Sequence, residues 1–249
     1  MKTFLADFRY VHGRTLTFAA ALPLIAAIPL IAEFIQHVVE MRIGMYASVE
    51  AAQAAESHPD RLLFGFFKTV ALGLPAYFLI RWLFSDGNRK FARSLERPAV
   101  ILFAMVIGLQ ALFSWLSLYV WNDGYMATGF FVFGLIFMPL IVRFVVAAPV
   151  GTLISPAQSI RTMLPHALYA IAFPIVAILP LMAVHYALGI GAIFVSGEAS
   201  KWAMMMVDSF VTAWLALVIT AANFVIATRP GAIRANGGEE NTAMGTTAR

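Results

Sequence analysis

Six ionisable side chains stand inside or at the edge of long apolar stretches of this sequence, where charge is costly and marks a structural or functional contact. They are Glu33, His37, Glu40, Lys68, His185 and Asp208. Glu33, His37 and Glu40 follow one another at intervals of four and three residues, which places them on one stripe of a single helix. A carboxylate beside an imidazole can exchange protons, and both groups are ligands for hard or borderline metal ions.

The heights of these residues along their predicted helices indicate that they lie close together. At ~1.5 Å per residue, Glu33 and Lys68 both lie roughly 8 Å outward from the middle of their helices. By the same rise, His185 and Asp208 lie about 10 Å outward, and His37 lies a little further. We therefore expect a polar cluster, drawn from four helices, in the outer half of a membrane.

Three interpretations of this cluster remain open. In the first, Glu33 pairs with Lys68 and the other polar groups form hydrogen bonds near the outer headgroups, so the cluster only holds helices together. In the second, it lines a solvated cavity that binds a polar or anionic headgroup or relays protons. In the third, His37 and His185 are axial haem ligands, or His37 with Glu40 or Asp208 holds a hard or borderline metal ion. No catalytic residue, cofactor or metal is assigned from the sequence, because paired spacing such as H-E-x-x-H is absent.

The composition predicts the elements that carry the cluster. Of 249 residues, 61% are hydrophobic and 12% are charged, whereas about a quarter of a soluble domain is charged. A helix needs roughly 20 residues to cross a bilayer. Six apolar blocks are near or above this length: Leu16–Val39, Leu62–Phe84, Pro98–Trp121, Thr128–Val150, Pro165–Ile193 and Trp202–Thr228. We therefore predict an all-α fold, a polytopic membrane helix bundle with about six transmembrane helices.

Several function classes are excluded by what the sequence lacks. It contains no cysteine, which excludes disulfides, thiolate metal sites and covalent c-type haem. It has no phosphate-binding loop, serine-nucleophile elbow or dinucleotide fingerprint. The formal net charge is +4, but the basic residues stand in short segments beside apolar blocks. The expected partner is therefore the lipid bilayer, and no nucleic acid is predicted to bind.

The distribution of basic residues predicts the orientation. Of 17 Lys and Arg residues, all except Arg42, Arg61, Lys68 and Lys201 fall on the side of the two chain ends or near its edge. Positive residues stay with cytoplasmic loops. We therefore expect both termini on the cytoplasmic side. Residues 1–15 are predicted to be a cytoplasmic interfacial segment, residues 16–230 the transmembrane domain, and residues 231–249 a disordered cytoplasmic tail.

Three segments inside the domain have distinct expected roles. We predict an outer loop at 40–61 with a short helix, a basic cytoplasmic loop at 85–97, and an interfacial helix at 155–164 that Ser155 caps. Contacts to anionic headgroups on the cytoplasmic face are expected from Arg89, Lys90, Arg93, Arg97, Arg143 and Arg161.

Prolines are expected to kink several spans, because each removes an intrahelical hydrogen bond. They are Pro23, Pro29, Pro75, Pro139, Pro174 and Pro180. Broken helices can line a substrate site in transporters, but proline is also more frequent in membrane helices in general. We favour the second explanation.

The segment from Arg143 to Pro174 carries a resemblance. Arg143 is followed by Ala147-Ala148-Pro149, then by Ser155-Pro156-Ala157-Gln158-Ser159-Ile160-Arg161, and then by a new apolar helix. In this order of residues the chain resembles the six-helix bacterial inner-membrane proteins related to the membrane domain of glycerophosphoryl diester phosphodiesterases. The resemblance implies that fold, a bacterial inner membrane and a non-enzymatic membrane role.

These observations lead to one functional hypothesis and two alternatives. The hypothesis is a non-enzymatic inner-membrane protein with a transport-like, lipid-contacting or membrane-organising role. The first alternative is a membrane redox or metal-binding protein that uses His37 and His185. The second is an accessory subunit whose polar stripe meets a protein partner in the membrane.

Overall fold

The computed structural model describes residues 2–121 and 124–233, and every regular element among these residues is a helix. Six helical segments are long and apolar enough to cross a membrane: Pro23–Arg42, Pro59–Phe84, Arg97–Tyr119, Gly124–Val150, Pro156–Phe194 and Glu198–Thr228. The predicted all-α bundle with six spans is therefore confirmed. The chain is a multi-pass membrane protein whose apolar outer surface contacts the lipid bilayer.

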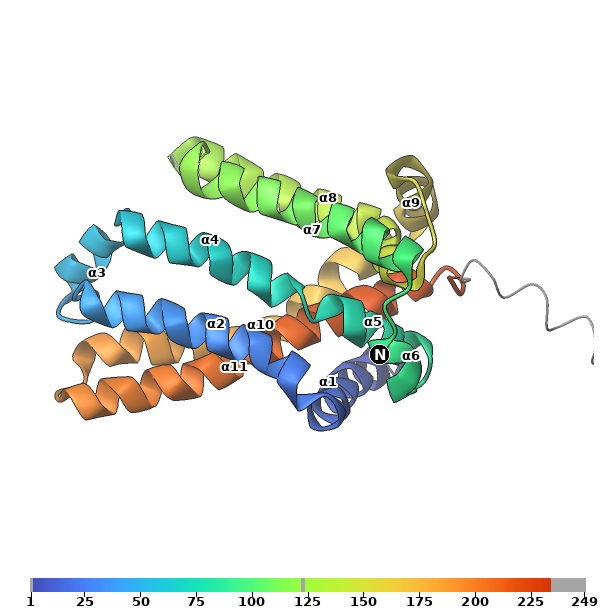
Figure 1. Cartoon of the computed structure of the whole chain (residues 1–249). Coiled ribbons are helices and arrows are strands. Elements are labelled where there is room, and N and C mark those ends of the chain that lie inside the picture. The colour runs from blue at the N-terminus through green and yellow to red at the C-terminus, as the bar shows by residue number, and fades with distance from the viewer. Residues whose placement is uncertain (1, 122–123, 234–249) are drawn as a thin grey trace, which may run out of the picture.

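The spans lie side by side with short helices at the two ends of the bundle (Figure 1). The long elements are α2 (Pro23–Arg42), α4 (Pro59–Gly73), α5 (Ala76–Phe84), α7 (Arg97–Tyr119), α8 (Gly124–Ala147), α10 (Ala167–Phe194) and α11 (Glu198–Thr228). The others are α1 (Lys2–Ala21), α3 (Val49–Ala55), α6 (Arg89–Arg93), α9 (Pro156–Met163) and the 3₁₀ turns η1 (Ala148–Val150) and η2 (Leu164–His166). We call the two ends of the bundle the α3 end and the α9 end.

Helix α11 is the central element of the bundle. It packs against α10, α2, α1, α8 and α5, and a larger share of it is buried than of any other span. Its buried residues include apolar ones such as Val218 and Ile226, and also the polar residues Asp208 and Thr212. A polar group on these faces of α11 therefore meets other helices rather than lipid.

The first membrane span begins later than the sequence predicted. The apolar block Leu16–Val39 was expected to be one helix preceded by a separate interfacial segment, but α1 continues to Ala21 and α2 begins at Pro23. Leu22 between them has φ −133° and ψ 59°, because a proline disfavours the helical conformation in the residue before it. Pro23 itself opens α2, where its missing N–H is not needed.

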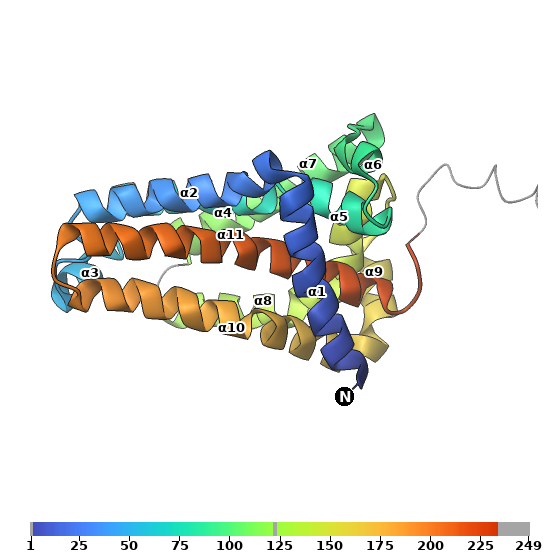
Figure 2. The ribbon, with the colours of Figure 1, turned by 90° about the horizontal axis from the view of Figure 1, so that it is seen from below.

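This break lets α1 leave the direction of the bundle. Figure 2 shows α1 crossing α10 and α11 steeply instead of running alongside them. Val11, Thr15 and Phe18 recur on one face of α1 and are all fully buried. Residues 2–21 thus form one packed helix, which corrects the predicted boundary at residue 15.

The remaining prolines have different effects. Pro75 separates α4 from α5, whereas Pro29, Pro139, Pro174 and Pro180 lie inside continuous helices. A proline removes one hydrogen bond, and neighbouring helices can satisfy the carbonyl that is freed. Among these five prolines, Pro75 alone lies at a break between two α-helices of one span.

Two predicted segments differ in detail from the structure. The expected outer loop at 40–61 starts within α2, which continues to Arg42, so Glu40 is helical. Beyond it, the Ser48 hydroxyl caps α3 by accepting a hydrogen bond from the backbone N–H of Ala51 at 3.1 Å. Of the predicted tail, residues 234–249 lie outside the described part of the chain, and Ile233 is buried against the core.

Arg81 joins three segments at the α9 end. Its fully buried guanidinium donates hydrogen bonds to the carbonyl oxygens of Phe91 and Pro149, each at 2.9 Å. It also donates to the Ser94 hydroxyl and the Glu96 carboxylate. One side chain therefore ties α5 to the loop around α6 and to η1 at the end of α8.

Replacing Arg81 by methionine is expected to destabilise the fold strongly. Hydrogen bonds to charged groups contribute about 1.5–3 kcal/mol each, and buried carbonyls would lose their donor. We expect Arg81→Met to lower the free energy of unfolding by on the order of 3 kcal/mol, measured by thermal unfolding in detergent. Arg89→Met is the control, because Arg89 is exposed. Equal melting temperatures for the two variants would contradict the role assigned to Arg81.

Candidate functional site

The structure brings the six predicted cluster residues together from four helices. Glu33, His37 and Glu40 lie on α2, Lys68 on α4, His185 on α10 and Asp208 on α11. The three carboxylates and His37 are buried, with no more than 5% of any of these residues exposed. By their positions along these helices, the cluster residues lie in the half of the bundle nearer to the α3 end. That this half faces the outer side of a membrane remains a prediction.

Asp208 joins the two imidazoles of the cluster. Its Oδ1 lies 2.8 Å from Nδ1 of His185, and its Oδ2 lies 3.0 Å from Nε2 of His37. The other nitrogen of His37, Nδ1, lies 3.0 Å from Oε2 of Glu40. A neutral imidazole has a single N–H. The contacts of His37 with Glu40 and Asp208 are therefore both hydrogen bonds only if one further proton is bound, either on His37 or on one of the two carboxyl groups.

Glu40 is held by donors on both of its oxygens. The Tyr46 hydroxyl donates to Oε2 at 2.6 Å, and Gln36 Nε2 and Arg61 Nε donate to Oε1 at 3.1 and 3.3 Å. Burial, together with the charge of Glu40, raises the pKa of Tyr46 far above its ordinary value. Tyr46 therefore remains a hydrogen-bond donor at any physiological pH.

Glu33 forms the predicted ion pair with Lys68. The Lys68 Nζ lies 3.3 Å from Oε1 and 3.2 Å from Oε2 of Glu33, and Oε1 also lies 3.5 Å from His37 Nε2. The cluster thus contains three carboxylates, whereas, among the residues that the structure describes, Lys68 and Arg61 are the only fixed cations that contact them. One negative charge remains for an imidazolium or a bound cation to balance.

Three partners of the cluster were missing from the prediction. Tyr46 and Arg61 contact Glu40, and Thr212 Oγ1 lies 3.2 Å from His185 Nδ1. Gln36, which its spacing places on the same stripe of α2 as Glu33, His37 and Glu40, also contacts Glu40. The spacing of four residues between Asp208 and Thr212 was a usable signal, because it places both on one face of a helix. Tyr46 follows the turn at the end of α2, so no helical spacing relates it to Glu40.

Most of the predicted headgroup contacts lie on the surface at the α9 end. Those that are exposed are Arg89, Lys90, Arg93, Arg97 and Arg161. Arg143 differs, because its Nη1 donates to the carbonyl oxygens of Ala227 at 2.8 Å and Gly231 at 3.0 Å. Arg143 was predicted to contact lipid headgroups. In the structure it donates hydrogen bonds to carbonyl oxygens at the end of α11, which have no partner within the helix.

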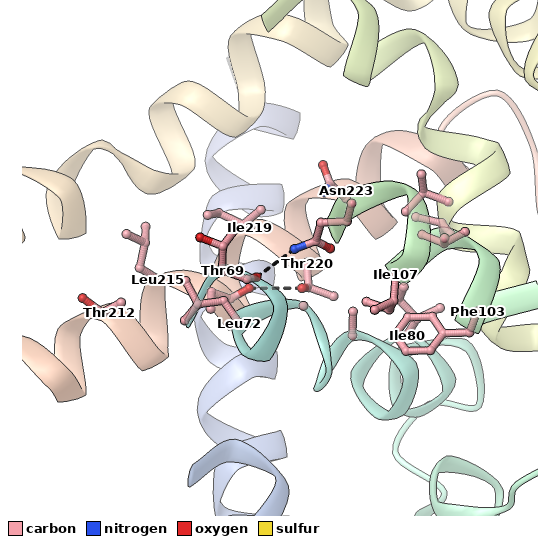
Figure 3. A pocket seen from close by; sticks show the side chains of 17 residues that line it. Thr69, Leu72, Ile80, Phe103, Ile107, Thr212, Leu215, Ile219, Thr220 and Asn223 are labelled. Carbon is pink, nitrogen blue, oxygen red and sulfur yellow. Dashed lines mark hydrogen bonds between the residues drawn. The ribbon is translucent and has the colours of Figure 1, made fainter. Parts of the chain in front are cut away.

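A cavity of about 280 Å³ adjoins the cluster between α4, α5, α7, α8 and α11. Most of its lining is apolar, and its polar lining residues are Thr69, Gln110, Thr212, Thr220 and Asn223. Figure 3 shows Thr212, Thr220 and Asn223 along α11 on one side of this space. Thr212 also contacts His185, and Thr69 follows Lys68 in α4, so the cavity begins where the cluster ends.

Gln110 crosses this region from α7 to α4. Its Nε2 donates to the Thr69 carbonyl oxygen at 2.9 Å, so Gln110 bridges α7 and α4. A Cβ atom on Gly73 would lie 2.6 Å from the Gln110 Oε1, so a larger residue there would make the amide of Gln110 shift. Asn223 forms no side-chain hydrogen bond within residues 2–121 and 124–233, and its amide is therefore available to a ligand or water in the cavity.

The fold and the site define a class: a multi-pass α-helical membrane protein with a buried cluster of carboxylates and imidazoles beside an internal cavity. No family model, curated protein or solved structure matches the chain. The functional argument therefore depends on the chemistry of the site.

The pair Glu33 and Lys68 is expected to show energetic coupling. Lys68→Met leaves a buried carboxylate without its cation, at a cost on the order of 3 kcal/mol. Glu33→Gln leaves Lys68 without its carboxylate partner, although 24% of the Lys68 side chain is exposed. Either single change should lower the melting temperature in detergent more than the double change does.

A surface pair provides the control for this cycle. Arg14 and Asp86 are 2.8 Å apart, but the Asp86 side chain is 94% exposed, so Arg14→Met and Asp86→Asn should couple by less than about 1 kcal/mol. Strictly additive effects of Glu33→Gln and Lys68→Met would show that the buried pair does not stabilise the bundle.

Proposed function

We propose that the chain is a transport-like protein of a bacterial inner membrane, in which the buried cluster binds a cation on a path through the bundle. The observation that carries this proposal is the excess of carboxylates over fixed cations in the cluster. A purely structural ion pair would need only Glu33 and Lys68. Buried carboxylates beyond such a pair are costly in a bilayer unless they serve a cation.

The placement of polar groups along α11 supports a path. Asp208, Thr212, Thr220 and Asn223 extend over about half of this helix, on the order of 20 Å at ~1.5 Å per residue. Thr212, Thr220 and Asn223 line the cavity. On the other side of the cluster, Arg61 reaches the α3 end and has a side chain that is 29% exposed. Together these groups form an interrupted polar track from one end of the bundle past its middle.

Two parts of the alternatives have less support: a haem held by His37 and His185, and a protein partner that meets the polar stripe. Asp208 places its two oxygens against one nitrogen of each imidazole, an arrangement that does not favour His37 and His185 as a pair of axial haem ligands. The polar stripe of α2 meets α4 and α11 in the interior, so it offers a protein partner little surface. The orientation, the headgroup contacts of the basic residues and the resemblance to six-helix inner-membrane proteins remain predictions.

The polar track is expected to be reached by water. Because the chain has no cysteine, Thr212→Cys and Asn223→Cys can be introduced without other changes and treated with water-soluble methanethiosulfonate reagents in membranes. A thiol reacts as a thiolate, which forms only in water. We expect both variants to react, and Thr212→Cys to react faster with a cationic reagent than with an anionic one, because the neighbouring cluster has an excess of carboxylates.

Phe210→Cys is the matched control, because Phe210 lies two residues before Thr212 on the same helix and is 59% exposed on the outer, apolar face. Its thiol should be unreactive. If Thr212→Cys and Asn223→Cys are as unreactive as Phe210→Cys, the cluster has no aqueous path and the proposed function is wrong.

The orientation has its own test. Gln53 on α3 and Lys90 on α6 are both exposed, at opposite ends of the bundle. With both termini cytoplasmic, an impermeant thiol reagent should label Gln53→Cys once the outer membrane is permeabilised. Lys90→Cys should be labelled only after the inner membrane is opened. The reverse pattern would refute the orientation that the basic residues predict.

A further inference from the structure

We infer that Glu33, His37 and Asp208 form a binding site for one divalent first-row transition-metal ion of the Zn²⁺ or Mn²⁺ type. Glu33 and His37 are one turn apart on α2, and Asp208 faces them from α11. One ligand atom of each residue lies within 4.8 Å of the others, and all three residues are buried. This inference rests on the proposed function and deepens it, because it names the class of cation.

The distances suit a small ion. His37 Nε2 lies 3.0 Å from Asp208 Oδ2 and 3.5 Å from Glu33 Oε1. Zinc lies about 2.0–2.2 Å from nitrogen and oxygen ligands, so neighbouring ligand atoms of a tetrahedral site are roughly 3.4 Å apart. The two distances at His37 lie on either side of this value. An ion can therefore enter by small side-chain adjustments while α2 and α11 stay in place.

Two of the three ligands also have a partner on their far side, which is an observation separate from their closeness. These partners are Glu40 at His37 Nδ1 (3.0 Å) and His185 at Asp208 Oδ1 (2.8 Å). The third ligand, Glu33, is paired with Lys68, whose Nζ lies 3.3 and 3.2 Å from its two oxygens. In metal sites the outer partner of a histidine or carboxylate fixes its orientation and aims the remaining lone pair at the ion. In the loaded site, Nδ1–H of His37 donates to Glu40 and Nε2 faces the ion.

The ligand types select the class of metal. Mg²⁺ and Ca²⁺ prefer sites made of oxygen alone, and soft ions such as Cu⁺ prefer sulfur. One imidazole with two carboxylates suits borderline divalent ions, and the chain has no cysteine to compete for them. Three protein ligands leave a fourth position open, as in sites that exchange water or substrate.

The charge of the cluster permits both states. With neutral imidazoles, three carboxylates face the two cations Lys68 and Arg61, which leaves a net charge of about −1. A divalent ion changes this to about +1. Neither state departs far from neutrality, which limits the penalty for burying the charges.

The test uses the full-length chain, purified in mild detergent without a polyhistidine tag and treated with EDTA. It is titrated with Co²⁺, followed by visible absorption, and then with Zn²⁺ as competitor. We expect one equivalent of Co²⁺ to bind saturably and Zn²⁺ to displace it. His37→Gln and Asp208→Asn should each weaken Co²⁺ binding by at least 100-fold, and His185→Gln by about 10- to 100-fold, as for changes in the outer partners of metal ligands.

His166→Gln is the matched control, because His166 lies in η2 near α9, at the opposite end of the bundle, and its loss should leave the affinity unchanged. Failure of the EDTA-treated wild-type protein to bind either ion would overturn the inference, whether or not the variants fold. Equal affinities of the wild type, His37→Gln and Asp208→Asn would also overturn it. Reactive cysteines along α11 with no metal binding would refute the metal site alone, whereas metal binding with unreactive cysteines would refute the path alone.

Discussion

The carboxylate of Asp208 meets an imidazole from each of two other helices, His185 on α10 and His37 on α2, while its own helix occupies the centre of the bundle. A carboxylate that loses such partners inside a membrane costs several kcal/mol. The heights and rotations of α2, α10 and α11 are therefore tied to one another through a single side chain. Glu40 extends the same chain of contacts to Tyr46 and to Arg61 at the start of α4.

The two ends of the bundle satisfy buried charge in different ways. Near the α3 end, carboxylates and imidazoles face one another across helices. At the α9 end, Arg81 and Arg143 donate mainly to backbone carbonyls, at the loop around α6 and at the end of α11. Between these regions lies the cavity, where the polar lining groups are neutral hydroxyls and amides. Buried charge thus lies toward both ends of the bundle, and the cavity between them has only neutral polar groups that a ligand or water can contact.

The composition of the cluster favours a cation-binding role over a purely structural one. Interhelical ion pairs need equal numbers of acids and bases, but here three carboxylates contact two fixed cations, and the two imidazoles share one of those carboxylates. Such a site can hold a proton or a metal ion with little change in its surroundings.

The sequence by itself determined the number of spans and the level of the cluster. Apolar blocks must be about 20 residues long to cross a bilayer, and the constant rise of a helix converts residue number into depth, so the predictions for Glu33, Lys68, His185 and Asp208 agreed in height. Only the tertiary structure decided which residues face one another, because depth does not specify the rotation of a helix or the order of its neighbours. It decided that Asp208 lies between the two imidazoles, that Tyr46 folds back onto Glu40, and that Arg143 meets carbonyls of α11. It also decided that Pro23 starts a new helix, because a proline that opens a helix and one that kinks it look the same in a run of apolar residues.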